Sequence, residues 1–118
     1  MSTYVGSCHC GAVRYEVELD LDAVQPAACN CSMCRRAGTL LTFVPESSFR
    51  LLAGEDATRD YQFNKRHIHH LFCTTCGLKP YAWGPAKDGG RTIAVNVRCL
   101  EGVDLDALRI THFDGASL

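Results

Sequence analysis

The chain has 118 residues, of which 47% are apolar. That is enough to bury one hydrophobic core and too little for two, so we expect a single domain over residues 1–118. Lys and Arg number 12 against 13 Asp and Glu, giving a net charge of −1. This balance excludes the basic surface that sequence-independent binding to nucleic acid requires.

Most of the chain shows the period-two pattern of strands. In residues 13–19, Val13, Tyr15, Val17 and Leu19 alternate with charged side chains, which predicts a half-buried strand. Similar alternation or short apolar runs predict further strands at 39–44, 59–64, 67–73, 91–100 and 108–113. The last of these is expected at the edge of a sheet.

Turn and helix signals are few. The Gly-Gly pair within residues 85–90 predicts a hairpin before the strand at 91–100. Residues 32–38, ended by Gly38, and residues 103–108 each predict one helical turn. The pattern therefore favours a mainly antiparallel β domain pinned by metal.

The first ten residues lack the charged and apolar regions of a signal peptide. No window approaches 18 uninterrupted apolar residues, so we expect no membrane partner and a cytoplasmic location. Eight cysteines in a reducing compartment indicate metal ligands rather than disulfides.

Seven of the cysteines form three close groups, and Cys99 stands apart. The groups are Cys8 with Cys10, Cys29 with Cys31 and Cys34, and Cys73 with Cys76. The first and third are each followed by a glycine, which can adopt positive φ and let backbone N–H groups point at the thiolates.

Counting ligands leaves two arrangements open. The first and third groups together supply the four cysteines of a structural zinc site, which leaves the middle group as an open, three-cysteine site. The 18 residues between Cys10 and Cys29 equally fit a zinc ribbon built from the first two groups. That arrangement would leave Cys73 and Cys76 to pair with a histidine.

The order C-x-C-G, C-x-C-x-x-C and C-x-x-C-G, with "VNVRCL" at 95–100, resembles the glutathione-dependent formaldehyde-activating enzyme family. That family shares a domain with centromere protein V, and the resemblance runs from about residue 4 to 113. It implies a mainly β "β-tent" fold, in which small antiparallel sheets are pinned by a four-cysteine zinc site.

The resemblance also implies the ligand sets. Cys8, Cys10, Cys73 and Cys76 would hold a structural zinc. Cys29, Cys31 and Cys34 would hold a second, more labile zinc where glutathione acts. The chain is shorter than formaldehyde-acting members of the family, so the resemblance carries metal ligation to this chain more directly than substrate.

An open three-cysteine zinc would accept a small thiol such as glutathione and favour its thiolate. The partners are then a thiol and a small aldehyde, and the reaction class is carbon–sulfur lyase. Arg35 and Arg36 are candidates to bind a substrate carboxylate, although solvated arginines are common. The alternative is a non-catalytic, zinc-stabilised binding module.

Other polar residues have simpler interpretations. We expect His67, His69 and His70 to bond to backbone within a strand, Cys99 to be a buried free thiol, and Trp83 to pack in the core. The chain lacks the His-x-Glu pattern of zinc deaminases, and Gly77 and Pro80 oppose the helix that a thioredoxin-like motif requires.

Overall fold

The computed structural model describes residues 2–23, 25–63 and 65–117, and these are built mainly from short strands. The strands are β1 (Ser2–Ser7), β2 (Arg14–Leu19), β3 (Ala27–Cys29), β4 (Leu41–Pro45), β5 (Phe49–Ala53), β6 (Thr58–Tyr61), β7 (His69–Cys73), β8 (Tyr81–Pro85), β9 (Arg91–Asn96) and β10 (Thr111–Phe113). The helices are α1 (Ser32–Ala37) and five 3₁₀ turns, η1 (Glu46–Ser48), η2 (Glu55–Ala57), η3 (Val97–Cys99), η4 (Leu105–Ala107) and η5 (Gly115–Ser117). The mainly β prediction is confirmed.

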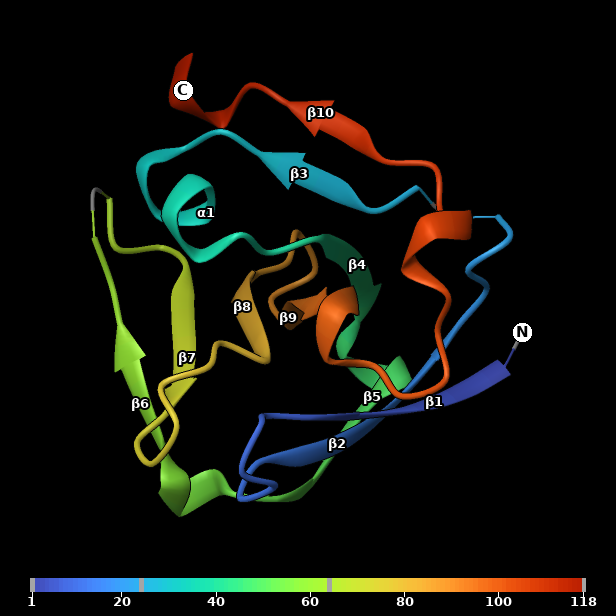
Figure 1. The fold of residues 1–118 in the computed structure, drawn as a ribbon. Coiled ribbons are helices and arrows are strands. Elements are labelled where there is room, and N and C mark those ends of the chain that lie inside the picture. The colour runs from blue at the N-terminus through green and yellow to red at the C-terminus, as the bar shows by residue number, and fades with distance from the viewer. Residues whose placement is uncertain (1, 24, 64, 118) are drawn as a thin grey trace.

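The strands form two sheets. A three-stranded sheet has the order β1-β2-β5, and a seven-stranded sheet has the order β10-β3-β4-β9-β8-β7-β6. Pairing is antiparallel except between β10 and β3. Figure 1 shows β10 at the upper edge of the large sheet and the small sheet below it, so the last strand is an edge strand as predicted.

The two sheets meet through a buried aromatic group. The ring of Tyr15 on β2 lies 5.0 Å from that of Phe49 and 5.8 Å from that of Tyr81, centroid to centroid. Its hydroxyl donates a hydrogen bond to the Pro80 carbonyl at 3.1 Å, which satisfies the one polar atom of the buried ring. The Tyr15 side chain thus ties the small sheet to the strand that follows the third cysteine group.

The two faces of the large sheet carry different apolar clusters. Ile93 and Val95 of β9 pack in the main core, whereas Ala94 points to the opposite face, as alternation along a strand requires. Ala94 packs there with Leu41, Ala82 and Cys34. The middle cysteine group therefore lies against a separate apolar surface from the main core, which contains Cys8 and Cys73.

Two of the predicted strands end early. The strand expected at 91–100 stops at Asn96, because the Asn96 side chain accepts a hydrogen bond from Arg98 N at 3.2 Å and caps η3. The prediction is therefore wrong for 97–100. The strand expected at 59–64 ends at Tyr61, and Asn64 lies outside the described residues.

Other predicted elements are present but shifted along the chain, and some strands were not predicted. The strands expected at 39–44, 67–73 and 108–113 begin two or three residues later than predicted. The hairpin at 85–90 and the helical turn ended by Gly38 are present. The sequence pattern missed β1, β3, β5 and β8, which are short or lack alternation.

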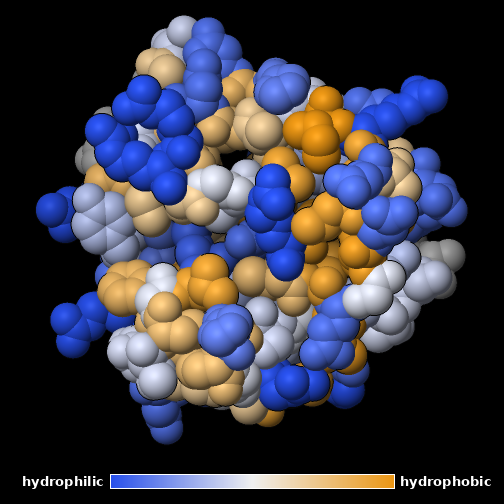
Figure 2. All heavy atoms as spheres, in the orientation of Figure 1, coloured by the Kyte–Doolittle hydropathy of each residue, from blue (hydrophilic) through white to orange (hydrophobic). Residues whose placement is uncertain are grey.

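No helix in the described ranges is long and apolar enough to cross a bilayer. Figure 2 shows hydrophilic atoms gathered over α1 and hydrophobic atoms over the segment that follows β9. The surface beside the middle cysteine group is thus the more polar part of this view.

Candidate metal centres and the adjoining cavity

The structure brings the first and third cysteine groups together. The sulfur atoms of Cys8, Cys10, Cys73 and Cys76 all lie within 4.8 Å of one another. Cys8 Sγ lies 3.6 Å from Cys10 Sγ, which lies 3.5 Å from Cys73 Sγ. A tetrahedral zinc site with Zn–S bonds of about 2.3 Å has sulfur–sulfur edges of roughly 3.8 Å, so the donor set fits such an ion.

Two loops build this four-sulfur cluster: the loop after β1 and the loop after β7, which lie together at the lower end of the molecule (Figure 1). In the second loop, Thr75 N donates to Cys73 Sγ at 3.4 Å and Cys76 N donates at 3.5 Å. Gly77, with φ of 78°, closes the turn. The C-x-x-C-G sequence thus aims backbone dipoles at the sulfurs.

These dipoles favour the thiolate form that metal ligands need. N–H groups at Cys76 and Thr75 hold the pKa of Cys73 below its ordinary value. N–H groups at Cys10 and Leu78 lower the pKa of Cys76 to about 6. Backbone N–H groups therefore help to prepare Cys73 and Cys76 for a cation.

The middle group forms a separate, three-sulfur cluster. The sulfur atoms of Cys29, Cys31 and Cys34 lie within 4.8 Å of one another, and within the described ranges the group includes no fourth Cys, His, Asp or Glu. Cys29 ends β3, while Cys31 caps α1 by accepting a hydrogen bond from Cys34 N at 3.3 Å. A soft donor set of this kind could hold a metal ion with one position open.

The thiols of this cluster have contrasting environments. Burial raises the pKa of Cys34 to about 11, and the charge of Lys79 opposes that rise. Burial also disfavours the Cys31 thiolate, but the N–H of Cys34 and the neighbouring thiols bring its pKa below the ordinary value. Burial holds the pKa of Lys79 below its ordinary value, although the charges of the three cysteines oppose that shift.

The C-terminal segment covers one side of the three-sulfur cluster. Asn30 N donates to the Phe113 carbonyl at 3.1 Å, and Ala116 N donates to Asn30 Oδ1 at 2.9 Å. A Cβ atom at Gly115 would lie only 2.5 Å from Cys29 Sγ. A residue larger than glycine would therefore push the segment away from the cluster.

Arg35 and Arg36 lie on the last turn of α1, and both are exposed. Arg36 Nη1 donates to the Ser32 carbonyl at 2.9 Å. Neither side chain forms an ion pair with another part of the chain that the structure describes. Their guanidinium groups are thus available to an anion, and their role in substrate binding stays a prediction.

The other polar candidates lie elsewhere. Neither cluster includes a histidine among the described residues, and the ribbon-like grouping of Cys8 and Cys10 with Cys29 and Cys31 does not occur within them. Cys99 lies near the four-sulfur cluster, where burial raises its pKa to about 11.

The histidines have structural partners. His69 stacks on Trp83 with ring centroids 3.7 Å apart, and its Nδ1 lies 2.5 Å from Asp60 Oδ2. His70 is buried and stacks on Phe63 at 5.1 Å. The expectation of backbone bonds from these rings is therefore wrong for His69, whose partner is a carboxylate.

A cavity of about 230 Å³ is connected to the three-sulfur cluster through Lys79 and Thr39, which line it and both oppose the rise that burial causes in the pKa of Cys34. Its walls come from α1, β6, β7 and the 77–79 segment, and they include Met33, Thr39, Tyr61, Lys79 and Asn96. Sequence reasoning missed Thr39, Lys79 and Asn96, because no motif marks an isolated lysine or threonine as buried. The only signal was the position of Lys79 between the C-x-x-C-G turn and Pro80.

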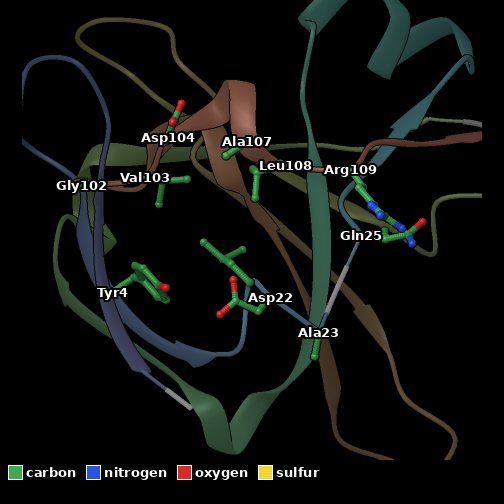
Figure 3. Close-up of a pocket in the computed structure, with 11 residues that line it drawn as sticks. Tyr4, Asp22, Ala23, Gln25, Gly102, Val103, Asp104, Ala107, Leu108 and Arg109 are labelled. Carbon is green, nitrogen blue, oxygen red and sulfur yellow. The ribbon is translucent and has the colours of Figure 1, made fainter.

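A second pocket, of about 480 Å³, lies between the β1–β2 side and the segment after η3 (Figure 3). Figure 3 shows Val103 and Leu108 on one side, Tyr4 opposite, and Arg109 beside Gln25. None of its lining residues is a cysteine or histidine, so this pocket contributes nothing to the metal chemistry.

A mainly β domain that holds a four-sulfur and an open three-sulfur cluster belongs to the class of small cysteine-cluster proteins that could bind two metal ions. Residues 3–110 match the family model of the glutathione-dependent formaldehyde-activating enzyme. The chain therefore belongs to that family.

A solved structure agrees with this assignment. The chain is similar to a Rhodobacter sphaeroides protein of known crystal structure, with 36% sequence identity and a TM-score of 0.78. The match covers 92% of this chain and 98% of the other. The family implies glutathione-linked formaldehyde activation.

Proposed function

We propose that the chain is a carbon–sulfur lyase-type protein that binds a small, glutathione-like thiol at a zinc held by Cys29, Cys31 and Cys34. It promotes addition of that thiol to formaldehyde or a related aldehyde, or the reverse reaction. The observation that carries the proposal is the three-sulfur cluster with no fourth protein ligand in the described chain, next to a cavity. Family membership supports the thiol and the aldehyde as partners.

The donor set decides which chemistry is reasonable. When bound, zinc would supply a soft fourth position for the substrate sulfur and would favour its thiolate. Three thiolates reduce the positive charge there, which disfavours generation of hydroxide from water. The protein's own contribution is therefore to position a thiol and to exclude competing ligands.

Residues around the cluster would orient the substrate. Arg35 and Arg36 are exposed beside Cys34 and could pair with carboxylates of a glutathione-like thiol. The C-terminal segment closes the side near Cys29. A thiol would then approach from the cavity side, between α1 and Leu78.

The other cluster has a different proposed role. Cys8, Cys10, Cys73 and Cys76 would hold a structural zinc, because their four sulfurs complete a tetrahedral set. We propose the reducing cytoplasm as the place of action, because cysteines grouped as metal donors suit a reducing compartment.

The test is a titration of the zinc-loaded protein with glutathione by calorimetry, in buffers of different ionisation enthalpy. We expect about one proton released per thiol near pH 7, because the metal takes the thiolate. S-methylglutathione, which has no thiol to ionise, is the control ligand, and Cys29→Ser is the control variant. If glutathione does not bind at millimolar concentration, the zinc-stabilised binding module replaces this proposal.

A further inference from the structure

Three buried polar atoms have no nitrogen or oxygen hydrogen-bond partner among the described residues: Thr39 Oγ1, His70 Nδ1 and Lys79 Nζ. Their residues are only 4%, 6% and 5% exposed. The Thr39 hydroxyl also faces the Cys34 thiol and opposes the rise that burial causes in its pKa. An unpaired buried polar group is costly, and an unpaired buried cation costs more. Such groups mark a place that an ion, a water molecule or a ligand completes, or they have a catalytic role.

All three belong to the surroundings of the three-sulfur cluster. The charge of Lys79 acts on Cys34, and Lys79 and Thr39 both line the 230 Å³ cavity. His70 pairs across β7 and β8 with Ala82, which packs against Cys34 in the second apolar cluster. The unsatisfied polar groups therefore gather around one site.

Asn96 lines the same cavity and connects the backbone of Lys79 with the backbone next to Thr39. Asn96 Nδ2 donates to the Lys79 carbonyl at 3.0 Å, and Asn96 Oδ1 accepts from Leu40 N, next to Thr39, at 3.4 Å. Pro80 follows Lys79, and its carbonyl accepts from Asn96 N at 3.1 Å. The backbone at both positions is thus fixed by one buried side chain.

Addition of a thiolate to an aldehyde creates negative charge on the carbonyl oxygen. Three thiolates around a divalent ion would leave a net negative charge there, which would not favour a second anion, so the stabilising charge has to come from the protein. Among the described residues that line this cavity, Lys79 is the one basic side chain. Preorganised donors facing developing charge typically supply a large share of rate enhancement.

We propose that Lys79, with the hydroxyl of Thr39, binds the carbonyl oxygen of the aldehyde and stabilises the oxyanion that forms there. This inference rests on the proposed function and adds a catalytic residue to it. The substrate sulfur forms a bond to the carbonyl carbon, and the carbonyl π electrons move to the oxygen. The thiol's proton has passed to solvent on binding, and the oxygen takes a proton from solvent, so Lys79 keeps its charge.

The first test measures anion binding at Lys79 and does not depend on catalysis. The chain has three lysines, Lys65, Lys79 and Lys87. Labelling lysine with ¹³C at Cε therefore gives three NMR signals, and each is assigned by substituting one lysine at a time. Formate, a small oxyanion, is titrated into the zinc-loaded protein. We expect the Lys79 signal to shift saturably and the exposed Lys65 and Lys87 signals to stay. A Lys79 signal that does not respond overturns the proposal.

The second test compares Lys79→Met with the exposed control Lys87→Met. At saturating thiol, we expect Lys79→Met to slow formation of the S-hydroxymethyl adduct about 100-fold, measured by exchange NMR. The protein should retain both zinc equivalents. Thr39→Val, which removes only the hydroxyl, should give a smaller loss of about tenfold.

Two outcomes overturn the proposal even if the formate shift is seen. One is a Lys79→Met rate within threefold of the parent at saturating thiol, which would mean that the lysine serves only thiol affinity. The other is loss of the second zinc, which would make Lys79 a counter-charge for the cysteines. If the parent protein forms no adduct, the proposed function fails, and the formate titration alone decides whether the anion site exists.

Discussion

The two cysteine clusters use the same donor atom, but the chain surrounds them differently. The four-sulfur cluster joins two loops that are separated by 62 residues, and its Cys8 and Cys73 are 3% and 0% exposed. The three-sulfur cluster comes from one short stretch, residues 29–34, and lies beside a cavity and a buried lysine. A metal that joins segments far apart in the chain stabilises the fold strongly. A cluster formed within one short stretch adds little to stability, so it can have a chemical role instead.

The largest expected effect is loss of the fold on substitution of the four-sulfur cluster. Structural zinc contributes on the order of 10 kcal/mol to folding in small zinc domains. Cys73→Ser or Cys10→Ser should therefore give insoluble or molten protein. Cys31→Ser should remain folded and lose at most one zinc. Circular dichroism with zinc analysis measures both, and equal collapse of the two kinds of variant would remove the distinction between the clusters.

The next largest effect is expected from loss of the hydrogen bonds that Asn96 makes beside the cavity. Asn96→Leu leaves Leu40 N and the Lys79 carbonyl without their partner. We expect a loss of about 2 to 3 kcal/mol in the free energy of unfolding, measured by urea denaturation. Gln62→Leu, which removes only a 3.4 Å hydrogen bond to Asp60 at the surface, is the matched control. Equal losses would mean that Asn96 is not a structural bridge.

His70 should make stability depend on pH. Burial lowers its pKa to about 4, with the charge of Lys79 as a second cause. The unfolded chain binds the proton below its ordinary pKa of 6.5, so this contribution is complete above pH 6.5 and is lost as the pH falls toward 4. The expected loss is on the order of 2 to 3 kcal/mol. The urea midpoints of the parent and of His70→Gln are measured as a function of pH. The difference between them should shrink as the pH falls from 6.5 toward 4, and a constant difference would contradict the assignment.

The smallest effect on stability is expected at Gly115. A Cβ there would lie 2.5 Å from Cys29 Sγ, so Gly115→Ala should displace the C-terminal segment. We expect zinc at the three-sulfur cluster to bind at least about tenfold more weakly while stability changes by less than about 1 kcal/mol. Gly90→Ala is the control, because a Cβ there would meet Asp88 and Glu46 and no cysteine. Competition with a chromophoric chelator measures the affinity, and an unchanged value would show that the segment does not constrain Cys29.

The sequence was informative where chemistry is local. The C-x-x-C-G turn, Gly38 after α1 and the alternation in β2 depend on neighbours in the chain, and the structure contains each of them. The fold class followed from the same signals. The order of the cysteine groups led to the correct family.

It was uninformative where tertiary contacts decide. Alternation continues through Val97, yet the Asn96 side chain caps a 3₁₀ turn and ends β9. Lys79 lines a cavity with residues of α1, β6, β7 and β9, and no period or motif in the sequence encodes that arrangement. The polar groups beside the cluster could therefore be found only in the structure.

The central claim is that one cluster is closed and the other is open to a thiol. The most direct measurement is ¹¹³Cd NMR of the cadmium-substituted protein, because the cadmium shift follows the number of thiolate ligands. We predict two resonances, of which one is unmoved by glutathione and the other moves toward the first as a fourth sulfur is added. Cys34→Ser should abolish only the second. Two resonances that both ignore glutathione, or a single resonance in the parent protein, would contradict the account.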